Sequence, residues 1–512
     1  MNVAHLFRQQ AEARPDALAL VQGSGARRQS VTFAELDARG ARAAGRLRAD
    51  GLGPGDAVLV LVPLSIRLYV LVSGILRAGG TVMLVDPGAG RYHLRACLDR
   101  RPPDAFVGTP KAHALRLVSR EVRRIPRHYV VGGWVPRAAR WRGGLAAETA
   151  EVEADAPALL TFTSGSTGQP KAIARSHGFL AAQHRALERT LDLRPGQRDL
   201  STLPVFVLAN LASGVTSLLP DADLRQPGNV DAARILAQIR RERPTRSAAS
   251  PAFYEQLLRS ASPGDLAGLN PAGVGGAPVF PDLLDRLVDA TGDTVAVYGS
   301  SEAEPIAHLR GRALSDTDRQ RVAAGEGLPA GYPVDDVDLR ILPDAWGTPL
   351  GPFTPDKWDG LAVGPGEAGE IAVAGEHVLA GYVDGEGDRE TKVRVGRRVW
   401  HRTGDAGRLD ADGRLWLLGR CSAAVRDTHG VLYPFQVEAS ARGLAGVGLA
   451  ALVPGQRTVA FEGSASPEAV ERHLAWAHVR AVQVGAIPLD ARHNAKVDYP
   501  ALAALVERAG GA

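Results

Sequence analysis

The sequence predicts an α/β protein, and three observations lead to this expectation. Short apolar runs of strand length alternate with helical patterns through most of the chain, which favours largely parallel sheets flanked by helices. The chain has 512 residues, too many for one hydrophobic core, so two or more domains are expected. Hydrophobic residues make up 45% and charged residues 23% of the chain, as is ordinary for a globular protein.

The expected elements follow in order along the chain. Residues 1–10 begin an amphipathic helix, and residues 58–62 form a strand that leads into a helix ending near Leu76. Residues 366–418 alternate apolar and polar positions between turns, which predicts a small β-subdomain within a large N-terminal domain. Further strands are expected at residues 81–85, 105–107, 157–163 and 294–297.

A domain boundary is expected between residues 419 and 420. The large N-terminal domain would comprise residues 1–419. Residues 420–512 carry their own strand and helix patterns and suffice for a small α+β domain. The alternative is that this tail continues the core of the main domain.

Several features exclude other classes of protein. Pro63 and Arg67 interrupt the most apolar stretch, which predicts a buried strand and helix and no transmembrane segment. The N-terminus lacks the pattern of a signal peptide. Two cysteines, Cys97 and Cys421, make neither a disulfide framework nor a metal site, which favours a cytoplasmic location. Net charge is only +4, and clusters such as residues 120–124 are interpreted as solvated helix faces, so no nucleic-acid partner is expected.

The most informative stretch is Thr-Phe-Thr-Ser-Gly-Ser-Thr-Gly-Gln-Pro-Lys at residues 161–171. A strand leads into this loop, and residues 173–187 can form a helix after it. Small and hydroxylated residues can turn several N–H groups and hydroxyls toward one anion, and Lys171 adds a positive charge, so the loop predicts a phosphate site. It is no Walker loop, because proline precedes the lysine and alanine follows it. The alternative is a flexible Ser/Gly surface loop.

Two later segments carry side chains suited to the rest of a nucleotide. Tyr298 follows a strand and can lie against a purine, and Glu302 can hold Mg²⁺ against phosphate oxygens. A helix N-cap at residues 300–301, paired with Glu304, is the alternative interpretation. Asp405 ends the run His-Arg-Thr-Gly-Asp and can accept hydrogen bonds from ribose hydroxyls, although such a run is a plain hairpin turn in most proteins.

Taken in order, the runs Thr-Ser-Gly-Ser-Thr-Gly-x-Pro-Lys, Tyr-Gly-Ser-Ser-Glu and Arg-Thr-Gly-Asp resemble the signatures of the adenylate-forming superfamily of acyl-CoA synthetases, nonribosomal adenylation domains and luciferases. The resemblance covers nearly the whole chain. It implies that ATP and Mg²⁺ activate a carboxylic acid as acyl-AMP, and that a mobile C-terminal domain pivots after Arg420. The implied catalytic residues are Thr163, Lys171, Glu302 and Lys496, with Glu302 as the metal ligand. By itself, Lys496 would be an ordinary surface lysine.

The resemblance also implies which segments bind the nucleotide. Residues 275–277 line the adenine pocket in the family, and an aspartate and an arginine contact the ribose. The implied nucleotide-binding residues are Thr163, Ser164, Gly165, Ser166, Thr167, Gly168, Lys171, Gly275, Gly276, Ala277, Tyr298, Gly299, Ser300, Ser301, Asp405 and Arg420. Residues 203–217 and 246–254 are expected to line an acyl pocket. Its candidates are Phe206, Leu208, Leu211, Val215 and Ser250, although the aliphatic ones are equally suited to a helix core.

The acceptor in the second step is less constrained. Coenzyme A ligases of the superfamily carry two aspartates where Ser422 and Ala423 stand, and a glycine at the position of His429, which disfavours coenzyme A here. Four segments instead resemble the β-lactone synthetases of bacterial olefin biosynthesis, although the chain lacks a histidine at residue 207 that is common in that group. These segments are residues 85–90, 106–113, 430–433 and 492–496.

The expected function is therefore activation of a fatty or β-hydroxy acid as acyl-AMP, followed by attack of the β-hydroxyl on the acyl carbon of the same molecule. One alternative is a ligase that forms a thioester with coenzyme A or a carrier protein. The other is a catalytically degenerate, nucleotide-binding partner of other biosynthetic enzymes.

Overall fold

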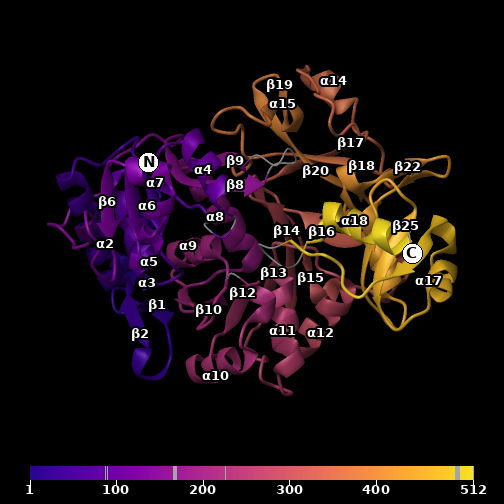
Figure 1. Cartoon of the computed structure of the whole chain (residues 1–512), viewed down its shortest axis with the longest axis horizontal. Coiled ribbons are helices and arrows are strands. Elements are labelled where there is room, and N and C mark those ends of the chain that lie inside the picture. The colour runs from indigo at the N-terminus through magenta and orange to yellow at the C-terminus, as the bar shows by residue number, and fades with distance from the viewer. Residues whose placement is uncertain (87, 89, 165–169, 225, 491–495, 511–512) are drawn as a thin grey trace. The chain divides into compact units, whose positions relative to one another are not determined.

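The computed structural model describes residues 1–512 except 87, 89, 165–169, 225, 491–495 and 511–512 (Figure 1). The chain divides into two compact units. The first unit contains Met1–Ala222, Ala237–Ala248 and Gly381–Asp388, and the second contains Asp223–Leu236, Ala249–Ala380 and Arg389–Ala512. Neither unit begins or ends at residues 419 and 420, so the domain boundary expected there stays a prediction.

A seven-stranded sheet belongs to the first unit, with the order β7-β6-β5-β3-β4-β8-β9. Its neighbouring strands are parallel except β8 and β9, which are antiparallel. Helices follow strands along the chain, as the alternating pattern predicts. The strands are β3 (Ala57–Leu61), β4 (Thr81–Met83), β5 (Ala105–Gly108), β6 (Arg127–Val130), β7 (Ala139–Arg140), β8 (Pro157–Ser164) and β9 (Pro170–Ser176). The helices are α2 (Phe33–Ala49), α3 (Ile66–Ala78), α4 (Arg91–Arg100), α5 (Pro110–His113), α6 (Leu115–Val118) and α7 (Arg120–Arg124).

Five more strands of the first unit pair in the order β12-β10-β11-β1-β2, parallel except for the antiparallel pair of β1 and β2. Helix α9 packs against β10 and β11 and contacts both α1 and α8. The strands are β1 (Leu18–Gln22), β2 (Gln29–Thr32), β10 (Arg198–Ser201), β11 (Thr216–Leu218) and β12 (Arg246–Ala249). The helices are α1 (Ala4–Ala13), α8 (His177–Leu191) and α9 (Pro204–Ala212), whereas α10 (Ala232–Glu242) is divided between the two units at residues 236 and 237.

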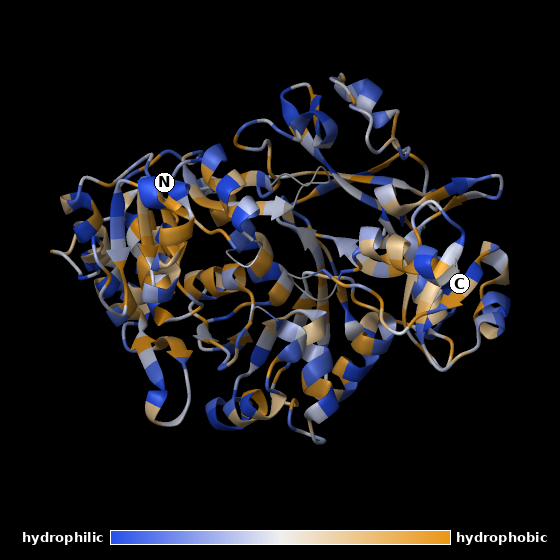
Figure 2. Cartoon of the chain, in the orientation of Figure 1, coloured by the Kyte–Doolittle hydropathy of each residue, from blue (hydrophilic) through white to orange (hydrophobic). Residues whose placement is uncertain are grey.

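Local sequence explains where two of these helices begin. Thr32 accepts a hydrogen bond from the N–H of Glu35, and the Glu35 carboxylate accepts one from the N–H of Thr32, which makes a capping box at the start of α2. Ser65 caps α3 in the same way through the N–H of Leu68. Apolar residues run through the strands of the seven-stranded sheet (Figure 2), where Leu59 and Phe106 are fully buried.

The second unit contains a mixed sheet with the order β17-β18-β20-β21-β16-β15-β14-β13, and β19 pairs with β20. Strands β13 and β14 run parallel, and the other pairs of this path are antiparallel. The strands are β13 (Ala272–Gly275), β14 (Thr294–Ser300), β15 (Ala303–Arg310), β16 (Leu328–Pro333), β17 (Asp338–Leu342), β18 (Gly369–Ala374), β19 (Lys392–Val395), β20 (Arg398–Leu409) and β21 (Leu415–Arg420). The helices are α11 (Pro251–Ser260), α12 (Pro281–Thr291), α13 (Asp316–Ala323), α14 (Pro355–Asp359) and α15 (Asp388–Thr391).

The C-terminal part of the second unit is α+β, as expected. A hairpin of β22 (Val425–Asp427) and β23 (Gly430–Leu432) precedes a three-stranded sheet with the order β24-β25-β26. Two hydrophobic clusters of this part draw their buried residues from the range 425–506. The remaining elements are α16 (Pro434–Arg442), β24 (Val447–Leu452), β25 (Thr458–Gly463), α17 (Pro467–His473), β26 (Arg480–Gln483) and α18 (Tyr499–Gly510).

Most of the expected elements are confirmed, including the strand and helix at residues 58–76 and the β-rich stretch at 366–418. Among the residues that the structure describes, none of the helices is long and apolar enough to span a bilayer. The helix expected at residues 173–187 is wrong at its start. Ile173 and Ala174 pair with Thr161 and Leu160 in the sheet, and α8 begins only at His177. Pairing with β8 outweighs the local helical pattern there.

Candidate active site

The predicted phosphate loop connects two antiparallel strands of the first unit. Thr163 and Ser164 end β8, and Lys171 lies near the start of β9, directly opposite Thr163 in the register. Gly165, Ser166, Thr167 and Gly168 lie outside the described residues. Because β9 follows the loop, no helix N-terminus begins directly after it. Backbone N–H groups, hydroxyls and Lys171 are therefore the groups that could hold a phosphate here.

The side chain of Lys171 is held by a segment to which the sequence analysis assigned no site residue, Gly381–Asp388. Lys171 Nζ lies 5.2 Å from the centre of the Tyr382 ring, within range of a cation–π interaction. The N–H of Val383 donates to Ala172 O at 3.1 Å, which fixes the segment against β9. Gly387 approaches so closely that a Cβ there would lie 2.6 Å from Lys171 Cε.

Ion pairs hold this same segment to helix α4. Arg100 of α4 forms ion pairs with both Asp384 and Glu386. Burial is the largest single cause and lowers the pKa of Arg100, but the hydrogen bonds to Glu386 and Asp384 and their charges together outweigh it, so the pKa is raised. The signal that could have located this contact is the acidic run Asp-Gly-Glu-Gly-Asp at 384–388. The residues around this run give no indication that it lies beside Lys171, which is more than 200 residues away in the sequence.

In the second unit, β13 and β14 end at the same edge, which brings two predicted segments together, residues 275–277 and residues 298–301. Gly275 lies opposite Val297, so Gly276, Ala277 and Tyr298 follow at the carboxyl ends of two parallel strands, where ligands commonly bind in such sheets. The Tyr298 hydroxyl donates a hydrogen bond to Asp405 Oδ2 at 2.8 Å. Burial, and then the charge of Asp405, raise the pKa of Tyr298 well above its usual value, so the phenol stays protonated and donates.

A tight turn joins β14 to β15 and carries Ser300, Ser301 and Glu302, preceded by Gly299. The N–H of Glu302 donates to Ser300 Oγ at 3.2 Å, and Glu302 O accepts from the N–H of Leu379 at 2.7 Å. The helix N-cap considered as an alternative is wrong, because Glu304 lies in strand β15. The Glu302 carboxylate is half-buried.

Asp405 and Arg420 lie opposite each other on β20 and β21. Arg420 Nε is 3.2 Å from Asp405 Oδ1, and Arg420 Nη1 donates to Thr403 O at 3.1 Å. The charge of Asp405 is the largest cause that raises the pKa of Arg420. Gly404 allows this turn, because it has φ +71° and a Cβ there would lie 2.8 Å from the Trp346 ring. A carboxylate offers about four lone-pair positions, so Asp405 can still accept hydrogen bonds from a ligand.

Lys496 belongs to the same unit and lies within the electrostatic reach of this cluster. The N–H of Asp490 donates to Lys496 O at 2.8 Å, and the N–H of Lys496 donates to Asp490 Oδ1 at 3.0 Å, which closes the base of its loop. Lys496 is exposed as a residue. Partial desolvation of its ammonium group, followed by the positive charge of Arg420, lowers the pKa of Lys496, whereas Asp405, Asp490 and Glu302 act in the opposite direction.

The donor groups of the second unit fit a magnesium ion that is bound mainly by a nucleotide. Among the described residues, no group of three or more His, Cys, Asp or Glu side chains could hold a metal ion by itself. Mg²⁺ typically uses one or two carboxylates, several waters and substrate phosphates. The single half-buried carboxylate of Glu302 suits that role.

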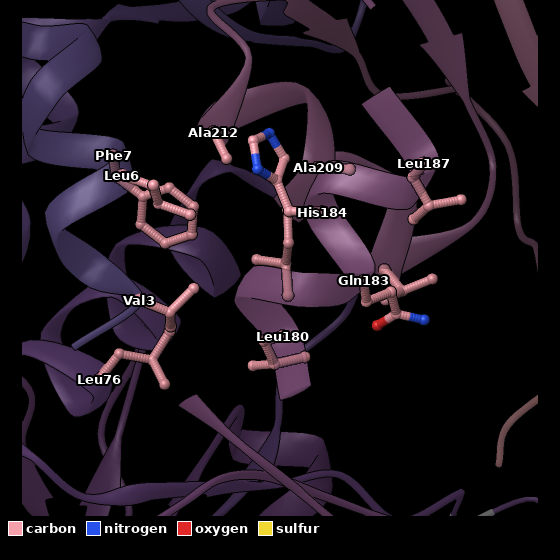
Figure 3. Close-up of a pocket in the computed structure, with 12 residues that line it drawn as sticks. Val3, Leu6, Phe7, Leu76, Leu180, Gln183, His184, Leu187, Ala209 and Ala212 are labelled. Atoms are coloured by element: carbon pink, nitrogen blue, oxygen red, sulfur yellow. The ribbon is translucent and has the colours of Figure 1, made fainter. Parts of the chain in front are cut away.

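The candidate acyl-pocket residues do not share one environment. Phe206, Leu211 and Val215 are 5% exposed or less in the packing around α9, and Ser250 caps α11 through the N–H of Phe253. Leu208 lines a cavity of about 20 Å³ together with side chains of α1, α3 and α8 (Figure 3). That volume suits about one water molecule and no acid. The contacts of Leu208 thus favour the helix-core alternative, and an acyl-binding role for these residues stays a prediction.

The fold and the relatives of this chain are those of adenylate-forming enzymes, which activate a carboxylic acid. The chain belongs to the family of AMP-binding enzymes, whose model matches residues 7–383. An olefin beta-lactone synthetase of Xanthomonas campestris is 33% identical, over 98% of this chain and 97% of its own length. A second olefin beta-lactone synthetase, from Stenotrophomonas maltophilia, is 34% identical with the same coverage. A feruloyl-CoA synthase of Amycolatopsis is 30% identical over 86% of this chain and 83% of its own length.

Solved structures support the same fold. ATP-bound MatB from Rhodopseudomonas palustris superposes with a TM-score of 0.78 at 21% identity and covers 99% of both chains. The anthranilate CoA ligase AuaEII in complex with anthranoyl-AMP gives a TM-score of 0.80 at 19% identity, covering 100% of this chain and 98% of its own. At these identities the likeness shows the fold alone.

Proposed function

We propose that the chain uses ATP to activate a 3-hydroxy fatty acid as its acyl-AMP and then closes the acyl-AMP to a β-lactone. In the first step, a carboxylate oxygen of the acid attacks the α-phosphorus of ATP, and the bond to pyrophosphate breaks. The observation that carries this step is the cluster of Tyr298, Asp405 and Arg420, which presents an oriented carboxylate with spare lone pairs, with Glu302 and Lys496 close enough to influence its charges.

The proposed roles follow from the chemistry of each group. Asp405 accepts hydrogen bonds from the ribose hydroxyls and is oriented by Tyr298 and Arg420. Lys496 donates to the oxygens on which negative charge develops as the acid attacks. Glu302 holds Mg²⁺, which supplies positive charge beside the phosphates.

In the first unit, Thr163, Ser164 and Lys171 are proposed to bind the β- and γ-phosphates of ATP. Tyr382 and Gly387 keep the ammonium group of Lys171 in one place. An anchored cation loses little conformational entropy when the phosphates bind, so it contributes more to positioning than a free lysine would.

The lactone step needs no second substrate. The 3-hydroxyl oxygen attacks the acyl carbon, a ring C–O bond forms, AMP leaves with the electrons of the acyl–phosphate bond, and the hydroxyl proton is released. Because nucleophile and electrophile belong to one molecule, the enzyme only has to orient them. The extent of identity to two olefin beta-lactone synthetases supports this step over others.

We also propose that residues 420–512 act as a domain separate from residues 1–419 and deliver Lys496 to the reaction. The support is that two hydrophobic clusters are built around buried residues of the range 425–506 alone. A segment with its own core can move as a body.

The test is product analysis with ATP and 3-hydroxy acids of graded chain length, with and without coenzyme A. Matched controls are the 2-hydroxy acid and the unsubstituted acid of the same length, which can be adenylated but cannot close a four-membered ring. We expect a β-lactone and AMP from the 3-hydroxy acid alone, independent of coenzyme A. Release of AMP that requires coenzyme A, with a thioester as product, would contradict this proposal and favour the ligase alternative. The 30% identity to a feruloyl-CoA synthase is the observation that supports this alternative.

A further inference from the structure

One segment of the first unit carries far more positive charge than the rest of the chain. Between residues 105 and 147, nine residues are basic and one, Glu121, is acidic, so this segment has a net charge of +8. The whole chain has a net charge of only +4, which leaves the remainder negative. The basic residues are Lys111, Arg116, Arg120, Arg123, Arg124, Arg127, Arg137, Arg140 and Arg142.

Apolar side chains project from the same segment. Leu117 and Val118 of helix α6 are 81% and 55% exposed, and Trp134, in the loop after β6, is 67% exposed. Two hydrogen bonds bring this loop to α6, because Arg116 donates to Pro136 O at 2.9 Å and to Arg137 O at 3.3 Å. We call α6, α7 and residues 131–142 the basic face; Figure 1 shows α6, α7 and β6 close together.

Few of the charges on the basic face are neutralised within the protein. Among the ion pairs of the described residues, none within 4.0 Å involves Arg120, Arg123, Arg124 or Arg137, and Glu121 pairs with Arg95 of α4. The arginines of α7 are exposed. Neither the fold nor the proposed chemistry accounts for this concentration of cations around exposed aliphatic and indole side chains.

We propose that the basic face docks on an anionic lipid surface, with Leu117, Val118 and Trp134 inserted between head groups and the arginines paired with lipid phosphates. Tryptophan prefers the membrane–water interface, and apolar side chains ringed by Arg and Lys are typical of proteins that lie on a bilayer. Each basic residue near an anionic bilayer strengthens binding about fivefold.

The geometry favours a lipid surface over other anionic partners. Side chains as exposed as Leu117 and Trp134 project from the surface and do not line a groove into which a protein segment would fit. A second copy of the chain would bring two faces of like charge together, which opposes association. Nucleic acid would engage the arginines but would gain little from exposed aliphatic side chains such as Leu117 and Val118.

The test is sedimentation of the full chain with vesicles of phosphatidylglycerol and phosphatidylcholine, compared with vesicles of phosphatidylcholine alone. It is done without ATP or acid, so its outcome does not depend on the proposed reaction. One variant, Arg120→Gln with Arg123→Gln and Arg124→Gln, removes three charges, and another, Leu117→Ser with Trp134→Ser, removes inserting side chains. The matched control removes three exposed arginines elsewhere: Arg259→Gln with Arg397→Gln and Arg480→Gln.

We expect binding to the anionic vesicles that weakens with added salt. The charge variant should bind on the order of a hundredfold more weakly. The apolar variant should also bind more weakly, the control should match the wild type, and all should retain the wild-type Tm. The proposal is overturned by no binding to anionic vesicles at low salt, by equal binding to both kinds of vesicle, or by equal losses in the charge variant and its control. Tighter binding to an acidic protein or to duplex DNA than to the vesicles would also overturn it.

Discussion

Replacement of Gly387 by alanine is expected to displace Lys171 and slow acid activation. An ideal Cβ at residue 387 would lie 2.6 Å from Lys171 Cε and 2.7 Å from Nζ. Ordinary contact begins near 3.4 Å, so the tip of the lysine must move by about 0.8 Å. A misplacement of about 1 Å can cost roughly a hundredfold in rate. Because a lysine tip is flexible and can partly recover, we expect a loss of about ten- to a hundredfold.

The assay is exchange of labelled pyrophosphate into ATP with a 3-hydroxy acid, over a range of ATP concentrations, together with Tm. Gly385→Ala is the matched control. Gly385 lies in the same segment with φ +70°, compared with +93° at Gly387, so both alanines bear the backbone strain of a positive φ, about 1–2 kcal/mol at Gly385 and more at Gly387. The Tm of each variant reports this strain separately from the exchange rate. A Cβ at Gly385, however, would meet only Asp388 Oδ2, at 3.8 Å. Equal exchange rates in the two variants would refute the contact with Lys171 as the cause.

Three smaller predictions concern other groups. Tyr298→Phe removes the hydrogen bond to Asp405 and should raise the KM for ATP about tenfold with little change in kcat, measured by the same exchange. Burial, and then the N-terminal charge, lower the pKa of His177 from 6.5 to about 4. The free energy of unfolding of the wild type should therefore fall by up to about 3 kcal/mol as the pH is lowered from 6.5 to 4, and that of His177→Gln should not show this fall. Burial raises the pKa of Glu438 from 4.5 to about 7, so stability should fall as pH rises through that range, and Glu438→Gln should flatten this trend. Urea titrations across pH check both, and an unchanged profile in either variant would contradict the corresponding assignment.

Local patterns predicted much of the fold, because they report local structure and burial. The apolar run at residues 58–62 reads as a buried strand and forms one. The start of α8 was missed because Ile173 and Ala174 satisfy both a helical and a strand pattern, and only pairing with β8 decides between them. A local signal was present, since Ser176 caps the helix through the N–H of Phe179 at 3.1 Å.

The site residues that belong to recognisable sequence motifs could be predicted from the sequence. Tyr298 and Asp405, named separately as nucleotide ligands, form a hydrogen bond with each other in the structure. The support of Lys171 by Tyr382 and Gly387 could not be predicted, because it joins segments far apart in the chain and depends on tertiary packing. The positive charge of the basic face could be counted from the sequence. The proposal that this face binds a lipid surface depends in addition on the exposure of Leu117 and Trp134, which only the structure shows.

The central claim is that this chain joins a carboxylic acid to AMP with the help of Lys496. The most direct test compares pyrophosphate exchange in the wild type, in Lys496→Ala and in Lys357→Ala, an exposed lysine of α14 that serves as control. The account predicts exchange that depends on a 3-hydroxy acid, a loss of about a hundredfold or more in Lys496→Ala, and no change in Lys357→Ala. Exchange absent with every acid, or undiminished in Lys496→Ala, would contradict it.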